Sequence, residues 1–203
     1  VYPQTDVQLC EVEGGALAVY VADDPSRASG DRSRLVWTRY DEASDSWSEP
    51  RPVWDDGTAD FTPSLAPDGR GGAHVAWSNA RGAIADGATL ADVARRLDVA
   101  YAAFDARTGA FGPGEFVTDS DASLEASPKV TDAGDGPAIA WRTNRVDDVL
   151  GMEGGHEVLL ATRSGGAWSR RVVARCDGCV TGLAAGALDG RPTVAWATDE
   201  DGS

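Results

Sequence analysis

Gly71-Gly72-Ala73-His74-Val75-Ala76-Trp77 is a turn followed by a short apolar run that closes on a large aromatic residue. The same pattern returns at 135–141 (Asp-Gly-Pro-Ala-Ile-Ala-Trp) and at 190–196 (Gly-Arg-Pro-Thr-Val-Ala-Trp), with a looser copy at 14–20 (Gly-Gly-Ala-Leu-Ala-Val-Tyr). Self-similarity at a long, nearly constant period indicates a stacked or radial repeat architecture. The repeat therefore decides the fold class before any single element is considered.

The composition limits the classes of partner. The chain has 203 residues with 33 acidic and 18 basic side chains, which gives a net charge of -15. Nucleic acid is excluded as a partner, because a phosphate backbone needs a basic face. No apolar run approaches the roughly 18 residues of a membrane-spanning helix, so we expect no membrane insertion. The chain begins at Val1 without an initiator Met or signal peptide, and we expect a mature product or an excised piece.

Each repeat contains short runs with the alternation and the aromatic or β-branched residues of strands. Four antiparallel strands per unit, repeated radially, indicate an all-β fold, the β-propeller. We predict that 1–203 is a partial propeller with three blades and a half blade, at about 7–54, 62–118, 127–174 and 181–198. The repeat residues Trp77, Trp141 and Trp196 should be largely buried, and Pro50 and Pro52 should confine the fourth strand of the first blade to a sheet edge.

The second unit carries an insertion at 80–96 that the sequence predicts to be helical. Thr89 can cap a helix, with Asp92 three positions later as a weakened capping box. An apolar stripe at helical spacing follows, made of Leu90, Val93, Ala94 and Leu97. We expect a two-turn helix on the rim of the propeller.

The turn before the fourth strand has a recurring pattern. It reads Tyr40-Asp41-Glu42-Ala43-Ser44-Asp45-Ser46-Trp47, then Phe104-Asp105-Ala106-Arg107-Thr108-Gly109-Ala110-Phe111, and in shorter form Arg163-Ser164-Gly165-Gly166-Ala167-Trp168. An Asp, then a Gly or Asp, then an aromatic residue resembles the Asp-box of sialidase-like propellers, which reads Ser/Thr-x-Asp-x-Gly-x-Thr-Trp. The Asp should accept backbone N–H bonds, the small residue should adopt a left-handed conformation, and the aromatic should plug between blades.

The resemblance covers the whole chain as a repeat pattern, although each box lacks part of the full motif. The Asp-box is structural in its family and does not mark catalysis. Kelch repeats are the alternative, because Gly14-Gly15 and Gly71-Gly72 are doublets. Kelch doublets end the second strand, however, whereas these precede it. A propeller needs at least about four blades to close, so we expect the remainder of the propeller in the same or a cleaved chain.

Candidate ligand-binding residues lie in the loops between strands two and three, which share a face with the blade-joining loops. Arg81 and Arg145 follow the repeat Trp at the same distance, so two guanidinium groups in adjacent blades could hold a carboxylate or sulfate. Beside them lie further candidates, Asn79, Arg142 and Asn144. The alternative is that these arginines hold their own loops by pairing with Asp86, Asp147 and Asp148.

Two acidic sets lie in the blade-joining loops and form the second group of candidates. They are Asp55, Asp56 and Asp60 in one loop, and Asp119, Asp121 and Glu125 in the other. We retain Asp60, Asp121 and Glu125 as candidate ligand contacts. Oxygen-rich loops could bind Ca²⁺, but neither set has EF-hand spacing, and a solvated acidic face is the simpler reading. We therefore assign no cofactor.

The cysteines and histidines give no recognisable reactive centre. Cys176 and Cys179 form a Cys-x-x-Cys pattern without the further ligands that a zinc site needs, and we predict a small disulfide loop. Cys10 is left over. His74 lies in a repeat strand and should pack inside its blade, whereas His156 follows Gly154-Gly155 and should be more exposed.

The sequence favours a non-catalytic propeller module of a secreted or cell-surface protein, which binds glycan or protein through the face with the long loops. The chain has no Arg-Ile-Pro motif and no recognisable Tyr–Glu pair, which catalytic sialidases carry. The first alternative is a fragment of a sialidase-like propeller glycoside hydrolase or lyase, with its catalytic residues in absent blades. The second is a purely structural or adhesive domain, whose loops pack on a neighbouring domain.

Overall fold

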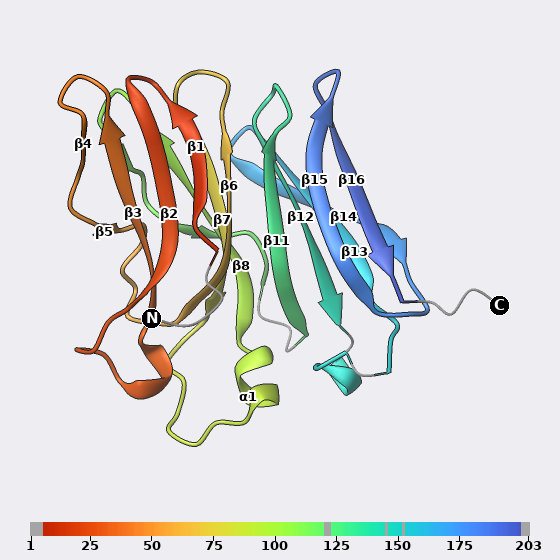
Figure 1. Ribbon diagram of the computed structural model, residues 1–203. Helices are drawn as coiled ribbons and strands as arrows, with labels where there is room; N and C mark the ends of the chain where they lie inside the picture. Colours follow the sequence, from red (N-terminus) through yellow and green to blue (C-terminus); the bar gives the residue numbers. More distant parts are fainter. Residues whose placement is uncertain (1–5, 120–122, 145, 152, 200–203) are drawn as a thin grey trace.

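A computed structural model describes residues 6–119, 123–144, 146–151 and 153–199. They form a partial β-propeller of three full blades and a half blade, as the repeat predicts (Figure 1). Every strand pair is antiparallel. No helix among the described residues is long and apolar enough to cross a membrane.

The strands follow the chain in blade order. Blade 1 contains β1 (Gln8–Val12), β2 (Gly15–Asp23), β3 (Ser33–Asp41), β4 (Ser46–Trp47) and β5 (Arg51–Pro52). Blade 2 contains β6 (Asp60–Pro67), β7 (Ala73–Ala80), β8 (Leu97–Asp105), β9 (Ala110–Phe111) and β10 (Glu115–Phe116). Blade 3 contains β11 (Leu124–Asp132), β12 (Pro137–Asn144), β13 (Glu157–Ser164) and β14 (Ala167–Arg175), and the half blade contains β15 (Val180–Leu188) and β16 (Arg191–Thr198).

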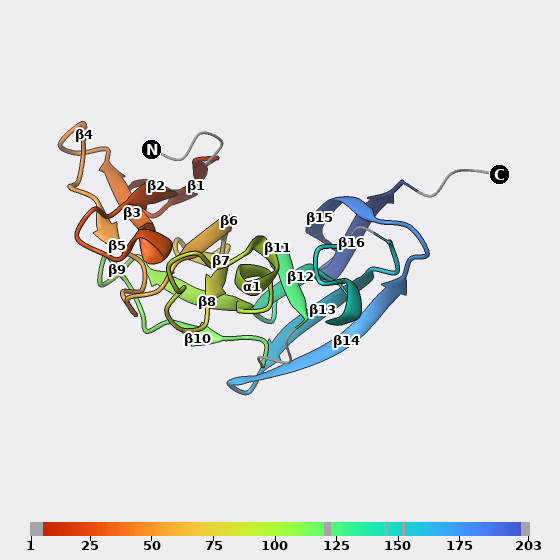
Figure 2. The same cartoon turned by 90° about the horizontal axis from the view of Figure 1, so that it is seen from below.

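The blades stand side by side in an arc when seen from below (Figure 2). Their first strands, β1, β6, β11 and β15, follow the concave side of the arc, and the fourth strands lie on the convex side. The hairpin turns gather at the upper end in Figure 1, and the loops after β2, β7 and β12 gather at the lower end. The two kinds of loop are therefore on opposite faces, as expected of a propeller.

Proline decides the shape of the fourth strand. In blade 1 this strand is broken into β4 and β5, each paired separately with β3, where we expected one continuous edge strand. In blade 2 it is broken into β9 and β10 around Pro113. Proline has no N–H to donate to a ladder. In blade 3, β14 contains no proline and pairs with β13 along its whole length.

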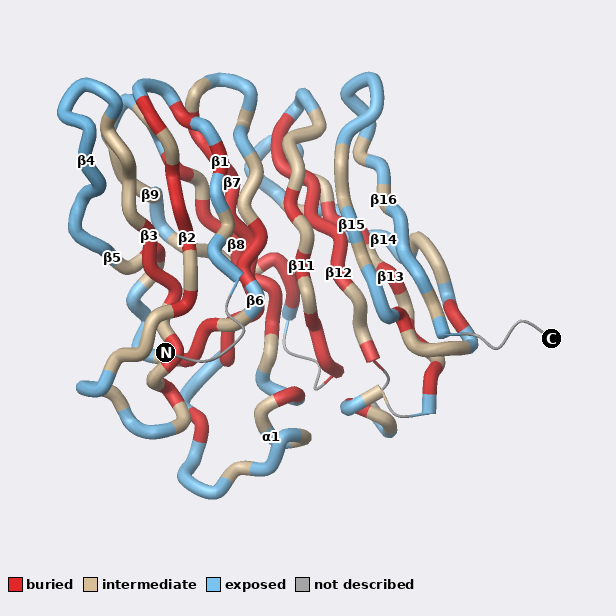
Figure 3. The backbone as a smooth tube through the Cα atoms, in the orientation of Figure 1, coloured by how far each residue is buried: buried red, intermediate tan, exposed pale blue. Residues whose placement is uncertain are grey.

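The core consists of side-chain layers between neighbouring blades. Figure 3 marks the buried residues of the strands in red. Trp77 and Trp141 are fully buried, as predicted, at the junctions of blades 1 and 2 and of blades 2 and 3. The expectation for Trp196 is wrong, because this residue is 40% exposed. Trp196 lies on the half blade, where the described residues form a two-stranded sheet and no third strand extends the layer that covers the ring.

The Asp-box turns behave as predicted in blades 1 and 2. Asp41 Oδ1 accepts the backbone N–H groups of Ala43 (2.8 Å) and Ser44 (3.1 Å), and Asp105 Oδ1 accepts that of Arg107 (2.8 Å). Asp45 and Gly109 adopt positive φ at the position expected for a small residue.

The closing aromatics of these turns bridge blades where a neighbouring blade is present. Phe111 lies 5.8 Å from Trp37 between ring centroids, and Trp168 lies 5.2 Å from Tyr101. Trp47 differs, since it is half exposed and contacts Tyr40 of its own blade. The predicted plug therefore forms at the two blade junctions but not at the outer side of blade 1.

The helical insertion is shorter than predicted. Helix α1 (Leu90–Ala94) has five residues, at the lower end of blade 2 (Figure 1). The predicted capping box is present: Thr89 Oγ1 accepts the Asp92 N–H at 3.2 Å, and Asp92 Oδ2 accepts the Thr89 N–H at 2.9 Å. Leu90 is exposed instead of belonging to the apolar stripe, whereas Val93 and Ala94 pack inward.

Candidate functional site

Strand register places a row of polar residues across blade 2 and across blade 3, near the end that carries the long loops. In blade 2, Asp60 pairs with Asn79, Asn79 pairs with Asp98, and Thr118 bonds to Asp98. We call this set the blade-2 ladder. In blade 3 the equivalent residues, which we call the blade-3 ladder, are Glu125, Thr143, Glu157 and Arg175.

The blade-2 ladder is closed at its inner end around Asp60. Asp60 accepts the Leu35 N–H of blade 1 (2.8 Å), the Trp77 indole N–H (2.7 Å) and the Asn79 amide (3.0 Å). Burial, the largest effect, raises the pKa of the Asp60 carboxyl to about 6, although these donors oppose the change. Both Asp60 and Asn79 are almost completely buried. These two candidates therefore stabilise the blade 1–blade 2 junction and present no surface to a ligand.

The other half of the blade-2 ladder is equally closed. Asp98 accepts the Thr118 hydroxyl at 2.7 Å and Arg81 Nε at 2.7 Å. Arg81 Nη2 also donates to the Thr118 carbonyl oxygen (2.8 Å), and its guanidinium lies 3.8 Å from the Phe116 ring centroid. Arg81 thus holds its own blade, which was the alternative reading, but its partner is Asp98 instead of the expected Asp86.

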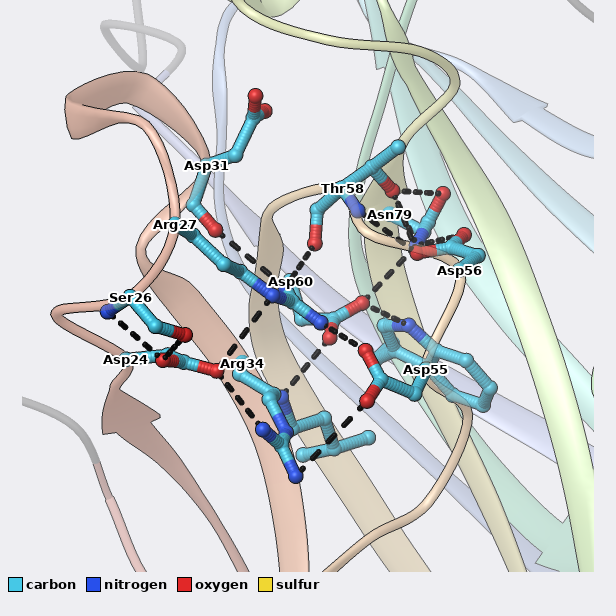
Figure 4. Close-up of polar contacts among 12 residues, drawn as sticks. Asp24, Ser26, Arg27, Asp31, Arg34, Asp55, Asp56, Thr58, Asp60 and Asn79 are labelled. Atoms are coloured by element: carbon cyan, nitrogen blue, oxygen red, sulfur yellow. Dashed lines mark hydrogen bonds and ion pairs between the residues drawn. The ribbon is translucent and has the colours of Figure 1, made fainter.

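Loop residues seal the same junction from outside, as Figure 4 shows. Asn79 Nδ2 donates to Asp56 Oδ2 at 3.0 Å, and Thr58 donates its backbone N–H to Asp56 Oδ1 at 2.9 Å. Arg27 donates to the Thr58 carbonyl oxygen at 2.8 Å and pairs with Asp55. The three carboxylates of the first acidic set, Asp55, Asp56 and Asp60, therefore each accept hydrogen bonds from protein groups.

The blade-3 ladder opens into a cavity of about 630 Å³, which is lined by residues of blade 3 and of the loops that flank its strands. Glu125, Thr143, Glu157 and Arg175 all line it. Arg175 Nε donates to Glu157 Oε1 at 2.7 Å, yet most of the Arg175 side chain is exposed. Arg170 lines the same cavity and pairs with Asp119 at 3.0 Å. Carboxylates and guanidinium groups thus line one cavity at the end that carries the loops.

Two buried side chains form the floor of this cavity. His156 is 1% exposed, contrary to the exposure we expected, because its Nδ1 accepts the Val180 N–H (2.8 Å) at the junction with β15. Burial lowers the pKa of His156, so the neutral imidazole is favoured. Asn144 is also buried and donates to the Val149 carbonyl oxygen at 3.0 Å.

The remaining candidates are placed as follows. Arg142 projects from β12 toward the half blade and donates to the Val180 carbonyl oxygen at 3.2 Å, away from Arg81. Arg145 and Asp121 lie outside the described residues. The sequence argument missed Glu157, Arg170 and Arg175. Alignment of the repeat would have found Glu157, because it occupies the position of Asp98 in the neighbouring blade.

The predicted Cys176–Cys179 disulfide is absent from the structure. The Cys179 thiol instead donates to the Gly151 carbonyl oxygen at 3.1 Å, while Cys176 is buried beside the cavity. His74 is packed as expected, with Nδ1 2.8 Å from the Tyr101 hydroxyl and Nε2 3.2 Å from Asp132. Among the described residues, no group of three or more acidic, His or Cys side chains is arranged to hold a metal ion.

No protein-family model matches the sequence, and no curated protein matches it. Solved structures share its fold. The chain is similar to the Hadza microbial sialidase Hz136 (TM-score 0.61, 12% identity, 89% of this chain and 39% of that one). It is also similar to a mutant Trypanosoma rangeli sialidase displaying trans-sialidase activity (0.60, 9%, 95% and 34%) and to an endo-arabinase from Bacteroides thetaiotaomicron (0.55, 12%, 98% and 71%).

These similarities show the fold and confirm the resemblance to sialidase-like propellers. The chain spans well under half the length of the two sialidases. Identities of 9–12% are too low to carry residue roles from one chain to another.

Proposed function

We propose that the chain is part of a propeller that binds a glycan in the cavity of the blade-3 ladder, as a non-catalytic module of a secreted or cell-surface protein. One observation carries the proposal: the polar ladder is closed in blade 2 but opens into a cavity of about 630 Å³ in blade 3. Loops of a rigid scaffold are common places for binding sites. The remainder of the ring would come from the same or a cleaved chain.

The chemistry of the cavity suits a sugar. Carboxylates such as Glu157 accept hydrogen bonds from hydroxyl groups, and the exposed guanidinium of Arg175 donates to ring or hydroxyl oxygens. Leu159 supplies apolar surface in the same cavity. A concave site of this size favours a small ligand over the flat surface of a protein partner. The similar solved structures include sialidases and arabinanases, which makes sialosides and arabino-oligosaccharides the first probes.

The test is a screen of immobilised oligosaccharides, followed by titration calorimetry with the best binder. Thr143→Tyr would fill the cavity from β12, and Thr108→Tyr is the matched control, because Thr108 lies on an exposed hairpin turn of blade 2 at the opposite end of the molecule. We expect Thr143→Tyr to abolish binding and Thr108→Tyr to leave it unchanged. Binding that survives Thr143→Tyr, or a folded wild-type chain that binds no glycan, would overturn the proposal.

A glycoside hydrolase is the second candidate, and one observation favours it. Glu125 and Glu157 line the same cavity from strands that flank β12, and a pair of carboxylates is the usual machinery of glycoside hydrolysis. Aryl glycosides with a chromogenic leaving group separate the two functions. The binding proposal predicts no turnover, whereas turnover that Glu157→Gln abolishes without weakening binding would establish the hydrolase.

A further inference from the structure

Two repeat positions face the following blade in both blade 2 and blade 3. In blade 2 they hold serines: Val130 donates its N–H to Ser64 Oγ at 3.1 Å, and Ser78 Oγ donates to the Glu125 carbonyl oxygen at 3.4 Å. Small hydroxyl side chains at these positions therefore fasten blade 2 directly to β11 of blade 3. The contact is close and leaves both hydroxyl groups satisfied.

The equivalent positions of blade 3 hold Lys129 and Arg142. The register supports this equivalence, because Ser64 is opposite Ala76 in blade 2 and Lys129 is opposite Ala140 in blade 3. Both first strands also have a bulge just before the position, with a non-glycine residue at positive φ, Thr62 in one and Ser127 in the other. Both serines of the repeat are thus replaced by cations.

The two cations lie on one face of blade 3. Arg142 is opposite Ala126 and Lys129 is opposite Ala140, so their side chains are diagonal neighbours on adjacent strands, within mutual reach of long side chains. The neighbouring residues Ala138 and Ala140 pack against Leu183 and Ala185 of the half blade, so this face looks toward β15. The serine contacts of blade 2 are replaced here by an open space.

This space is a cavity of about 590 Å³ between blade 3 and β15, separate from the cavity of the blade-3 ladder. It is lined by Ser127, Lys129, Arg142, Cys179, Val180, Thr181, Gly182 and Leu183. No Asp or Glu is among these lining residues, although the chain has 33 acidic side chains. Its hydroxyl groups, from Ser127 and Thr181, add neutral donors to the two cations.

Within the described residues, neither cation has a carboxylate partner. Arg142 bonds to a carbonyl oxygen, and no carboxylate of the described residues lies within ion-pair distance of Arg142 or Lys129. Elsewhere arginines are commonly paired, as Arg27 is with Asp55 and Arg81 is with Asp98. Burial disfavours the charged form of Arg142 and lowers its pKa. Two partly buried charges without a counter-charge are costly, and a bound anion would offset that cost.

We propose that Lys129 and Arg142 form an anion-binding site between blade 3 and β15, which takes the carboxylate, sulfate or phosphate group of a ligand. Arg142 would supply forked donors and Lys129 a point charge, with hydroxyl groups completing the site. The site is formed by residues that do not belong to the blade-3 ladder, so this proposal does not depend on whether the ladder's cavity binds a glycan.

Lys129 is the only lysine in the chain, which gives a direct test. Reductive methylation with ¹³C-formaldehyde keeps its charge and yields one side-chain NMR signal, separate from that of the α-amino group. We would titrate the labelled protein with acetate, glucuronate, sulfate and phosphate at constant ionic strength, using chloride and glucose as controls. We expect a saturable shift of the Lys129 signal with at least one oxyanion and none with the controls. The tightest anion identifies the group that the site prefers.

Matched variants distinguish anion binding at this site from nonspecific screening of the chain's charges. Arg142→Gln should lower the affinity for the anion about tenfold or more, since it removes charged hydrogen bonds. Arg191→Gln, at an exposed hairpin turn of the half blade, should leave the affinity unchanged. If Arg142→Gln disturbs folding, thermal unfolding of Lys129→Gln replaces it, and sulfate should raise the Tm of this variant less than that of the wild type. Non-saturating shifts with every oxyanion, or equal responses in all variants, would overturn the proposal.

Discussion

Blades 2 and 3 place side chains at the same positions of the same scaffold, yet one polar ladder is closed and the other is open. Blade 2 uses short side chains, and Asp60, Asn79, Asp98 and Thr118 all find partners within the blade junction. Blade 3 uses Glu157 and Arg175, which are longer and extend into a cavity. The backbone repeat fixes where a side chain starts, and side-chain length and charge decide whether the junction is sealed or available to a ligand.

The largest expected effect is on the free energy of unfolding, where loss of a repeat tryptophan should cost more in a full blade than in the half blade. Trp141→Ala should lower the free energy of unfolding by about 3–5 kcal/mol, because the ring is fully buried between blades 2 and 3. Trp196→Ala is the matched control and should cost far less, because its ring is 40% exposed. Urea unfolding followed by circular dichroism measures both, and equal costs would contradict the layered core.

The next largest effect compares equivalent acidic residues of blades 2 and 3, which should contribute differently to the free energy of unfolding. Asp98→Ala should cost about 3 kcal/mol, because it leaves Arg81 and Thr118 without the buried carboxylate they both contact. Glu157→Ala should cost about 1 kcal/mol or less, because its partner Arg175 is largely exposed. The same unfolding experiment tests this pair. A larger cost for Glu157 would mean that the blade-3 ladder is closed as well.

The pH dependence of stability should report Asp60. Its carboxyl has a pKa of about 6 in the folded chain, against an ordinary value of 3.8, so the folded state binds more protons between those values. Stability should therefore fall as pH rises from about 4 to 6 and change little above that, by on the order of 3 kcal/mol for this group. Asp60→Asn should lack this component. Identical pH profiles for wild type and variant would contradict the closed network around Asp60.

The two buried tryptophans should respond differently to loss of the indole N–H. Trp77 Nε1 donates to Asp60, whereas Trp141 Nε1 has no hydrogen-bond acceptor in the part of the chain that the structure describes. Both Phe substitutions remove similar volume, so Trp77→Phe should cost about 1–2 kcal/mol more than Trp141→Phe. Thermal or urea unfolding gives the difference. A smaller cost for Trp77→Phe would show that its bond to Asp60 adds no net stability.

The cysteines should differ in the rate at which their thiols react. This effect is the smallest, because it involves no change in the free energy of unfolding. Cys179 is partly exposed, whereas burial raises the pKa of Cys10 to about 11 and keeps it protonated. With a disulfide reagent under native, reduced conditions, Cys179 should react first, and Cys179→Ser should remove the fast phase. A fast phase that persists in this variant would contradict the assignment. In an oxidised sample, a peptide that contains both Cys176 and Cys179 and has lost two hydrogens in mass would establish the predicted disulfide.

The sequence predicted the fold better than the site. Repeat turns and apolar runs carry backbone information, so strands, blade order, the Asp-box turns and the cap at Thr89 could be derived. The broken fourth strands could be anticipated only in part, because the number of ladder bonds that prolines remove depends on the neighbouring strand. The exposure of Trp196 follows from the two-stranded sheet that the described residues form around it.

Site residues were harder to predict, because their environment depends on contacts between blades. Asn79 and Arg81 were chosen as ligand contacts because of their loop positions. In the structure, Asn79 donates its hydrogen bond to Asp60 and Arg81 donates to Asp98, both within the same blade. Glu157 and Arg175 follow no motif and become visible only when strand register aligns blade 3 with blade 2. Whether a polar side chain is buried depends on how the neighbouring blade packs against it, and the local sequence does not contain that information.

Hydrogen–deuterium exchange with and without a saturating oligosaccharide from the binding screen tests the central claim most directly. The account predicts slower exchange in the peptides that contain 157–159 and 170–176, which line the open cavity, and no change in 97–100 of the closed blade. Protection confined to blade 2 or to the hairpin turns at the opposite end would contradict it, because the glycan would then bind away from the blade-3 ladder.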